Sequence, residues 1–580
     1  MASTLVRPNI GLSQTIANVS VTAPLSIHSN VTSDRTLAAL LTVLVALSVY
    51  WLVFASPRSL HPRDSKIRPI TSAIPFIGSI GFYKDRVGFL RKHFGNPEAE
   101  GFHGGVRRIT VYDASIVLLA GTKQDAKNFF CSRTLKFTPA YHRLLSGIPA
   151  GVTPTAISTQ DEWDSVFKDN LKKAIRPERL AKLVPQMLED VRRSAHALPE
   201  WKEGTGMINP KDFSFPLIFG MSMRSVGLAE LADQPEVMAE LLRHYWAMEK
   251  SSSYWSIFFA TVPFPSSCMK AYNAVGASQE SRLDSQDDES LMTDDLTAFT
   301  LYNTIPQIKL YTILLKAAKQ RLQEARVEDD TFSMLLERGL DIHQALRFVM
   351  TGLFAAVFNS TTVAMWLLIY LGAHPEFRKR AATEVFDRLN SIADRQGIDW
   401  NSKSRVEQLQ ALSLEEWENG FDLVEAALRE TMRLVMEGTF FRLNVGASKG
   451  SEPQVHGENV KNGEFLGYWL GSTHRNAKIY SSPNRWDPER WARGEGSGEL
   501  EFLGWGVGMH PCTGIRFAKL EMKCFAVTFL VLMDWDSIDP RTGENFSLDT
   551  LPVPQLNGSE RMPLRVSEAL HSSSLIADPN

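Results

Sequence analysis

A single cysteine, Cys512, stands in a glycine-spaced loop whose residue types could bind a metal or attack a substrate. Gly506 and Gly508 precede it, and Gly514 follows it. The apolar residues after the loop recur at roughly helical spacing, which predicts a buried helix that begins just past the loop. We therefore expect Cys512 at a helix N-terminus. Free backbone N–H groups and the helix dipole favour an anion there, which predicts a lowered pKa for the thiol.

Three roles are open to the Cys512 thiol: a nucleophile, a metal ligand or an inert buried residue. No second cysteine stands at C-x-x-C spacing from it, which disfavours a zinc site or an iron–sulfur cluster. A lone thiolate suits haem iron, because a cysteine axial ligand pushes electron density onto the metal and favours O–O cleavage. Glycines on both sides would let the backbone come close to a bound group.

Residues 505–514, which read W-G-V-G-M-H-P-C-T-G, resemble the haem-binding signature of the cytochrome P450 family. Gly508, His510, Cys512 and Gly514 fall on positions of the signature, and Trp505 stands where phenylalanine is usual. The resemblance implies that Cys512 binds the iron of haem b (heme b, iron protoporphyrin IX). It also implies that His510 hydrogen-bonds a haem propionate, for which a surface loop histidine is the alternative.

Three further residues are expected to form an ionic cluster near this loop. Glu430 and Arg433 lie three apart on an apolar helix and so share one face, and Arg490 belongs to a later P-E-R segment. Spacing alone is a weak signal, since Glu189 and Arg192 show it too. The family order of motifs implies that Arg490 joins the pair. A buried carboxylate with two guanidiniums must be fully hydrogen-bonded, so we expect a structural role rather than catalysis.

The uncharged stretch from Phe348 to Gly372 is long enough to cross a membrane. However, it carries polar residues at 359–362, in mid-run, where polar groups are costly in lipid. A buried central helix explains both features. In the family such a helix crosses over the haem, and Trp366 with the later segment His374-Pro375-Glu376 matches the pattern that ends it.

Oxygen splitting requires protons at the distal oxygen, and a hydroxyl beside an acid or amide can order the water that carries them. The family's acid–threonine pair aligns here with Asn359 and Ser360, with Thr361 as the fallback. Asn359 cannot donate a proton as an acid does, so an O2-independent isomerase or dehydratase stays open. The other alternative is a helix with incidental polar residues that hydrogen-bond backbone carbonyls.

Two more side chains are candidates for the haem propionates. Trp163 and Lys168 stand where the family has a tryptophan or histidine and then an arginine. Lysine neutralises a carboxylate but lacks the bidentate fork, and a solvated helix face is the alternative for Lys168. His474, ahead of the P-E-R segment, is the second candidate.

The N-terminal region predicts a single membrane anchor. Residues 36–55 are mainly apolar and uncharged, and cations concentrate on their C-terminal flank. The positive-inside rule then places the catalytic part in the cytosol and the sequons at Asn18 and Asn30 in the lumen of the endoplasmic reticulum. A cleaved signal peptide is the rival, disfavoured by the long polar lead-in.

The predicted fold class is mostly α with a smaller β-sheet region (α+β), the cytochrome P450 fold with one N-terminal transmembrane helix. We expect a β-hairpin-like region over Val106–Leu119 and a helical region over Trp163–Val191. The predicted organisation is a lumenal segment 1–35, the membrane helix 36–55, a proline-rich hinge 56–75, a catalytic domain 76–565 and a flexible tail 566–580. The net charge of -3 gives no sign of a nucleic-acid partner, and four scattered cysteines make no disulfide framework.

These features predict a membrane-bound monooxygenase that oxidises a hydrophobic small molecule with O2. By resemblance to fungal members, the substrate is a terpenoid, a steroid or a polycyclic secondary metabolite. NADPH-cytochrome P450 reductase is the expected electron donor, because no G-x-G-x-x-G dinucleotide fingerprint that opens a helix after a strand is evident. The alternatives are the O2-independent enzyme and a non-catalytic haem- or sterol-binding membrane protein.

Overall fold

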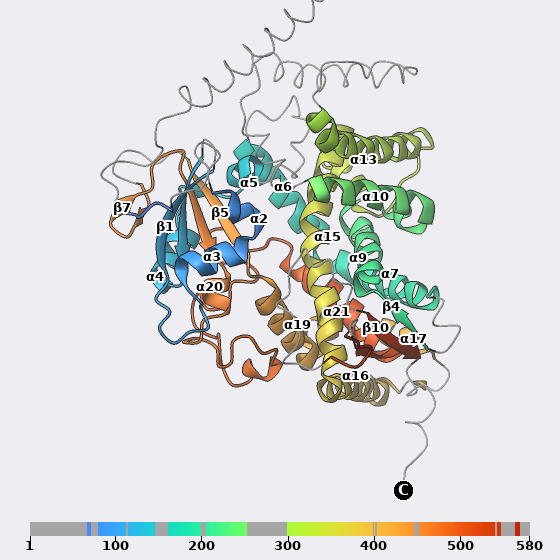
Figure 1. Ribbon diagram of the computed structural model, residues 1–580. Helices are drawn as coiled ribbons and strands as arrows, with labels where there is room; N and C mark the ends of the chain where they lie inside the picture. Colours follow the sequence, from blue (N-terminus) through green and yellow to red (C-terminus); the bar gives the residue numbers. More distant parts are fainter. Residues whose placement is uncertain are drawn as a thin grey trace, which may run out of the picture. The chain divides into compact units, whose positions relative to one another are not determined.

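The computed structural model describes residues 66–70, 79–111, 114–144, 160–198, 205–251, 298–397, 399–400, 403–445, 452–539, 542–546 and 563–568. All of them belong to one compact unit, Ser59–Asn580. Helices dominate and strands form a smaller part, which confirms the mostly α composition with a smaller β-sheet region (Figure 1). The predicted membrane helix 36–55, the sequons at Asn18 and Asn30 and most of the hinge lie outside the described residues.

The larger sheet has five strands in the order β1-β2-β8-β5-β3. The predicted hairpin is confirmed, since β1 (Gly105–Val111) pairs antiparallel with β2 (Ala114–Ala120). Strand β2 is buried on both faces: Ile116 and Leu118 join one apolar cluster, and Val117 and Leu119 join another. The other three strands are β8 (Phe465–Trp469), β5 (Thr439–Asn444) and β3 (Leu135–Lys136).

The central helix is α15 (Ile342–Ala373), drawn in yellow through the middle of Figure 1. It packs against α9 (Pro210–Val226), α19 (Asp422–Val435) and α21 (Ile515–Leu532). Asp341 and Gln344 form a capping box at its start, and Pro375 begins the next helix directly after it. In the described part of the chain, α15 is the one helix apolar and long enough to span a membrane, and most of it is buried by protein. The interpretation as a buried helix is confirmed.

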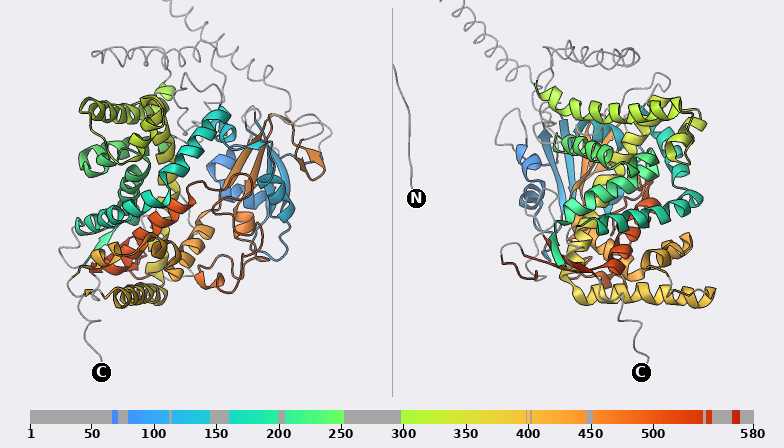
Figure 2. Two further views of the ribbon diagram at one scale, coloured as in Figure 1. Left: turned by 180° about the vertical axis from the view of Figure 1, so that it is seen from behind. Right: turned by 90° about the vertical axis from the view of Figure 1, so that its right-hand side faces the viewer.

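Helices enclose α15 on the side away from the larger sheet (Figure 2). The predicted helical region Trp163–Val191 is two helices, because the chain turns before Pro177, which stands in the first turn of the second. The remaining α-helices are α2 (Ile80–Lys84), α3 (Arg86–Phe94), α4 (Lys123–Phe130), α5 (Thr138–Leu144), α6 (Gln160–Ala174), α7 (Pro177–His196), α10 (Pro235–Ser251), α13 (Ala298–Gln323), α14 (Thr331–Glu337), α16 (Pro375–Gln396), α17 (Arg405–Gln410), α18 (Leu414–Asn419) and α20 (Gly471–His474). Short 3-10 helices are η2 (Ala229–Asp233) and η4 (Pro488–Arg490).

A second sheet follows α21 and has the order β4-β10-β9. Its strands are β4 (Thr205–Ile208), β10 (Leu564–Glu568) and β9 (Met533–Ser537), and β6 (Gln454–Val455) pairs separately with β7 (Glu458–Asn459). Strand β10 continues to Glu568, which is paired with Met533. The ordered domain therefore extends three residues beyond the predicted boundary at 565, because backbone pairing with β9 holds residues that composition alone assigned to a tail.

Candidate functional site

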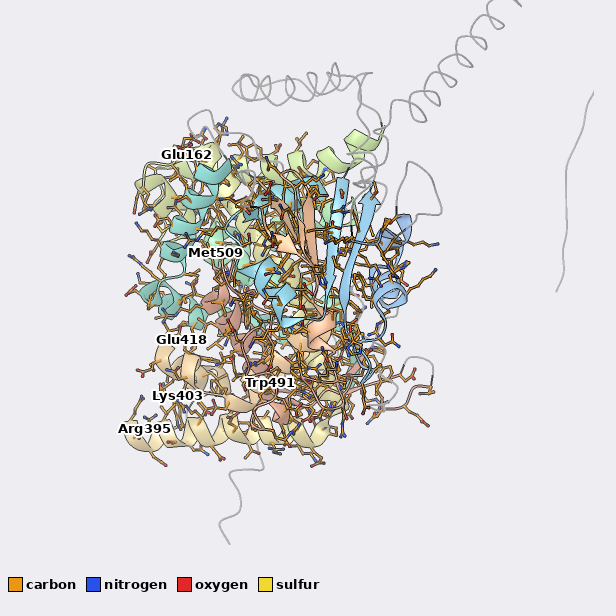
Figure 3. The ribbon with its side chains drawn as sticks, turned by 90° about the vertical axis from the view of Figure 1, so that its left-hand side faces the viewer. Glu162, Arg395, Lys403, Glu418, Trp491 and Met509 are labelled. Carbon is orange, nitrogen blue, oxygen red and sulfur yellow. The ribbon has the colours of Figure 1, made fainter. Side chains whose placement is uncertain are left out.

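The Cys512 loop is closed by its own backbone. The N–H of Cys512 donates to the carbonyl of Trp505 at 2.7 Å, and α21 begins three residues later, at Ile515. The predicted helix after the loop is thereby confirmed. Gly514 occupies the N-cap position of this helix, and a hypothetical Cβ on it would meet nothing within 4 Å. The loop is at the protein surface, where Met509, labelled in Figure 3, is 47% exposed.

Two glycines before Cys512 permit this closure. Gly506 and Gly508 have φ of +65° and +67°, in the left-handed region that disfavours side chains. A Cβ on Gly506 would lie 2.7 Å from the carbonyl oxygen of His510, and one on Gly508 would lie 2.3 Å from that of Phe130. The glycine spacing is therefore a steric requirement of this backbone.

The Cys512 side chain is exposed at the surface of the protein. Solvent reaches it, whereas Cys524 on the following helix is fully buried. The surrounding protein nevertheless raises the pKa of the Cys512 thiol, and a backbone hydrogen bond from Gly514 only partly opposes this. The predicted lowering of the thiol pKa is therefore wrong for the protein by itself, because one N–H does not offset the lost hydration. A bound cation would deprotonate the thiol outright.

His510, in the same loop as Cys512, lies near several cations. A ring nitrogen of His510, Nε2, donates to the carbonyl of Leu135 at 3.1 Å. Burial lowers the pKa of His510, and the charges of Arg442, Lys168 and Lys136 lower it further. The alternative of a surface loop histidine does not describe this half-buried, hydrogen-bonded ring. Lys168 is exposed on α6. It lies close enough to His510 for its charge to lower the pKa of the ring.

Arg442 is a site residue that sequence reasoning missed. It is 2% exposed on β5, donates to the carbonyl of Phe441 at 2.8 Å, and its Nε completes no hydrogen bond within the described residues. Burial lowers its pKa to about 10. No carboxylate of the described chain pairs with it, and buried guanidiniums are normally paired, so this side chain indicates an anionic ligand group. The available signal was one arginine in the apolar run T-F-F-R-L.

The predicted ionic cluster is present and completely buried. Glu430, Arg433 and Arg490 are each 0% exposed. The Glu430 carboxylate accepts from Arg433 at 2.7 and 2.9 Å, from Arg490 Nε at 2.9 Å and from the N–H of Asp487 at 3.1 Å. Glu189 and Arg192, which have the same spacing, pair at the surface instead. The structure thus brings the first three residues together as expected.

His474 links this cluster to the Cys512 loop. Its carbonyl accepts from Arg433 at 2.6 Å, its Nε2 accepts the N–H of Leu503 at 3.0 Å, and its Nδ1 donates to the carbonyl of Met436 at 3.1 Å. Burial and the nearby Arg433 lower its pKa to about 3, so the ring is neutral. The prediction that His474 contacts a propionate is therefore wrong, because the backbone occupies both ring nitrogens. Its role is to hold Leu503 at the start of the loop.

The central helix α15 opens to solvent along a narrow stripe. Ala355 and Asn359, one turn apart, are exposed although the helix is enclosed by others. Ser360 and Thr361 are buried, and the Thr361 hydroxyl completes no hydrogen bond within the described residues. The three predicted residues thus differ: Asn359 lies on the open face, and Ser360 lies on a buried face toward Glu521 of α21.

The family model "Cytochrome P450" matches residues 210–556, more than half of the chain. The chain belongs to the cytochrome P450 family. It is 24% identical over 515 residues to cytochrome P450 monooxygenase AacuE of Aspergillus aculeatus, covering 87% of this chain and 93% of that protein. It is also 24% identical over 540 residues to cytochrome P450 monooxygenase nsrP of Aspergillus novofumigatus, covering 90% of each.

The fold of this cytochrome P450 is also that of a solved structure. The retinoic acid-bound cyanobacterial CYP120A1 superposes with a TM-score of 0.61 at 18% identity, covering 87% of this chain and 99% of that one. The protein is thus an enzyme of the cytochrome P450 monooxygenase class, and members of the class bind haem b through a cysteine thiolate.

The residues present fit a haem. Cys512 is accessible in a loop that only glycines permit, and Arg442 is buried without an anionic partner. The face of α15 around Ala355 and Asn359 is open. These residues would offer a planar iron group with carboxylate arms a sulfur ligand and a cation.

Proposed function

We propose that Cys512 is the axial ligand of haem b in this enzyme, and that the enzyme inserts one atom of O2 into a hydrophobic small molecule. The balanced reaction converts substrate R–H, O2, two electrons and two protons into R–OH and water. The observation that carries the proposal is the accessible Cys512 in a loop anchored, through His474, to a fully buried ionic cluster. The bound haem supplies the chemistry of O–O cleavage.

The haem propionates are held by cations of the protein. Arg442 provides a buried guanidinium with an unused Nε, and His510 lies close enough to Arg442 for their charges to interact. Lys168 contributes positive charge from the exposed side of α6. Two carboxylates among these groups would remove the cost of leaving the Arg442 charge unpaired.

The substrate is apolar, because the open stripe of α15 is lined mainly by apolar side chains. Phe354 and Phe358 are partly exposed beside Ala355 and Asn359. By family analogy the substrate-lining residues come from Thr138–Val152, Gly352–Asn359, Glu437–Phe441 and Leu551–Leu556, of which residues 145–152 and 551–556 lie outside the described residues. A terpenoid, a steroid or a polycyclic secondary metabolite suits such a surface, and two fungal P450 monooxygenases are similar to this chain over most of its length.

Electrons come from NADPH-cytochrome P450 reductase, and the enzyme is anchored in the membrane of the endoplasmic reticulum with its catalytic domain in the cytosol. The uncharged run 36–55 and the cations that follow it support this placement. In this orientation the sequons at Asn18 and Asn30 are lumenal and available for glycosylation.

The ligand assignment is tested by the carbon monoxide spectrum of the reduced, haem-loaded protein. We expect the Soret shift that marks thiolate ligation in the wild type and its loss in C512A. C131A is the matched control, because Cys131 is also an exposed free cysteine but lies outside the loop. A thiolate spectrum in C512A, or its loss in C131A alone, would contradict the assignment.

A second candidate function is favoured by Asn359, which presents an amide instead of an acid on the open face of α15. In that case the enzyme is an O2-independent isomerase or dehydratase. The two functions separate in an assay with an extracted metabolite that displaces iron-bound water and shifts the Soret band to the blue. Product formation that requires reductase, NADPH and O2 supports the monooxygenase, and product formation without them supports the isomerase.

A further inference from the structure

A cation near the start of the central helix is buried without a counter-charge. Arg347 lies in the second turn of α15 and is 9% exposed. Within the described residues no carboxylate forms an ion pair with it, and its guanidinium donates no hydrogen bond. Buried charged groups are normally paired, because an unpaired one loses its hydration without compensation. Arg347 therefore has donors to offer to a group that the chain itself does not supply.

Trp163 of α6 holds the guanidinium in place. The central carbon of the Arg347 guanidinium lies 4.2 Å from the centre of the indole ring, and Trp163 is only 3% exposed. This distance is that of a cation–π contact, in which the electron-rich ring face attracts the positive charge. The ring face offers no oxygen acceptor for the guanidinium N–H groups. Trp163 thus orders the Arg347 side chain and leaves its hydrogen-bond donors unused.

The nearest acidic group, Asp164 of α6, is not a partner of Arg347. Its charge acts on Arg347, but no ion pair joins the two side chains, and the Asp164 carboxylate accepts a hydrogen bond from Thr138 at 2.5 Å. Burial lowers the pKa of Arg347, and the charge of Asp164 only partly opposes this lowering. The protein around Arg347 therefore does not compensate the loss of hydration of its charge.

Arg347 stands at one end of the open stripe of α15. Arg347, Thr351, Phe354 and Phe358 recur at successive steps of four, three and four positions, which places them along one side of the helix. Thr351, Phe354 and Phe358 are partly exposed, and Ala355 beside them is exposed. The Thr351 hydroxyl is already partnered, since it donates to the backbone carbonyl of Arg347 at 2.8 Å. A mainly apolar surface thus leads along α15 to one unpaired cation.

This cation is distinct from those assigned to the haem propionates. Arg442 and Lys168 act on the pKa of His510 in the haem loop, whereas the one charge of the described chain that acts on Arg347 is that of Asp164. At a rise of about 1.5 Å per residue, Arg347 lies about 12 Å from Ala355 and about 18 Å from Asn359 along the helix axis. Arg347 is therefore placed to meet a molecule that lies along α15.

We propose that Arg347 binds a carboxylate of the substrate, so that the substrate is a hydrophobic acid whose apolar body lies along α15 toward Asn359. This inference deepens the proposed function and rests on it. The planar guanidinium can bind both oxygens of a carboxylate at once, and the bound anion would supply the counter-charge that the protein lacks. Arg347 does not touch the reacting atoms. It determines specificity, because a neutral substrate would leave its charge unpaired.

The test compares the binding of two probes, pyrenebutyric acid and its methyl ester, to the haem-loaded protein by isothermal titration calorimetry. The probes share one polycyclic apolar body, and only the acid carries a charge at neutral pH. R347M should weaken binding of the acid about 10- to 150-fold, the effect of losing a charged hydrogen bond, and leave binding of the ester unchanged. R347K, which keeps the charge but not the planar fork, should recover part of the loss.

R338M is the matched control. Arg338 precedes α15 and also contacts α6, but its guanidinium already has the carboxylate of Asp169 at 2.8 Å and the side-chain oxygen of Asn170 at 2.6 Å. R338M should therefore leave the ratio of the acid and ester affinities unchanged. If R338M lowers this ratio as much as R347M does, the effect is one of general positive charge, and the proposal is refuted.

The remaining outcomes separate this inference from the proposed function. If the wild type does not bind the acid, or if R347M changes the affinities of acid and ester by the same factor, the carboxylate contact is refuted while the monooxygenase stands. If R347M loses haem instead of affinity for the acid, Arg347 serves the haem and the proposal is refuted as well. Calorimetry requires no turnover, so a wild type that forms product without O2 or reductase would refute the proposed function and still leave the result for Arg347 readable.

Discussion

Replacement of Glu430 by glutamine should destabilise the catalytic domain strongly, because the change leaves a buried guanidinium without a counter-charge. Arg490 keeps a second carboxylate, Glu495, at 2.6 Å. Arg433 has no second carboxylate: apart from those to Glu430, its hydrogen bonds within the described residues go to the carbonyls of His474, Pro483 and Arg485. In E430Q it is therefore Arg433, which is 0% exposed, that is left as a buried charge without a carboxylate partner.

The size of the effect follows from the geometry. Removing one partner of a buried ion pair costs about 3–5 kcal/mol, because the remaining charge stays desolvated. The total stability of a domain is about 5–15 kcal/mol, so E430Q should remove a large part of it. The loss should reach the haem loop, because Arg433 holds the carbonyl of His474, and the His474 ring holds Leu503.

The assay compares E430Q with E189Q in two measurements: the denaturant midpoint of unfolding and the fraction of protein that shows the carbon monoxide spectrum of thiolate ligation. Glu189 and Arg192 pair with the same spacing on a helix, but their side chains are 35% and 37% exposed, so E189Q should cost no more than about 0.5 kcal/mol. If E430Q unfolds within about 1 kcal/mol of E189Q, the argument from unpaired buried charge is refuted.

The remaining predictions concern the haem loop, the propionate site and the buried acid. G508A should destabilise the protein more than G457A in denaturant unfolding. Both glycines have positive φ, +67° and +78°, but only a Cβ on Gly508 would meet a backbone atom, the Phe130 carbonyl oxygen at 2.3 Å. Equal losses of unfolding free energy in the two variants would contradict the clash. R442M should weaken haem retention about 10- to 150-fold, since a charged hydrogen bond contributes about 1.5–3 kcal/mol. It should also stabilise the haem-free protein, because it removes the unpaired buried charge of Arg442. Haem transfer to an acceptor protein measures the first effect and thermal unfolding the second, and unchanged retention would exclude a propionate contact. Burial raises the pKa of Glu521 from 4.5 to about 8, so the folded state keeps a proton that the unfolded chain releases. The contribution of Glu521 to stability should therefore be full below pH 4.5 and fall as pH rises toward 8, by up to about 1.4 kcal/mol per pH unit. E521Q should lack this fall, and parallel pH profiles of the unfolding free energy of the two proteins would contradict the buried neutral acid.

Local sequence predicted the elements whose signals are themselves local. The glycine spacing around Cys512, the apolar run after it and the uncharged stretch of α15 correspond to a tight loop, helix α21 and a buried helix. The hairpin of β1 and β2 followed from β-branched residues around a short turn. Order along the chain, together with the family resemblance, also paired Arg490 with Glu430 across 60 positions.

Other features could not be read from the chain, because they depend on what surrounds a side chain. The thiol pKa of Cys512 is set by the protein packed around it, which outweighs the backbone N–H that the helix start supplies. The sequence made His474 a candidate for contact with a haem propionate, but its two ring nitrogens are used by Met436 and Leu503. Arg442 looked like an ordinary strand residue, and only burial without a carboxylate marks it.

By itself the sequence determined which residues could do chemistry and which elements they belong to, since loop glycines, helical periodicity and motif order are properties of the chain. Only the tertiary structure decided which of these side chains meet, and in what charge state. The clearest case is Glu521. Its place in the apolar sequence of α21 did not predict its charge state, which is set because α9 and α15 bring Ser222 and Ser360 to it and no cation of the described chain pairs with it. Burial and partner choice act across distances that no sequence window contains, and they set the free energy of each charge.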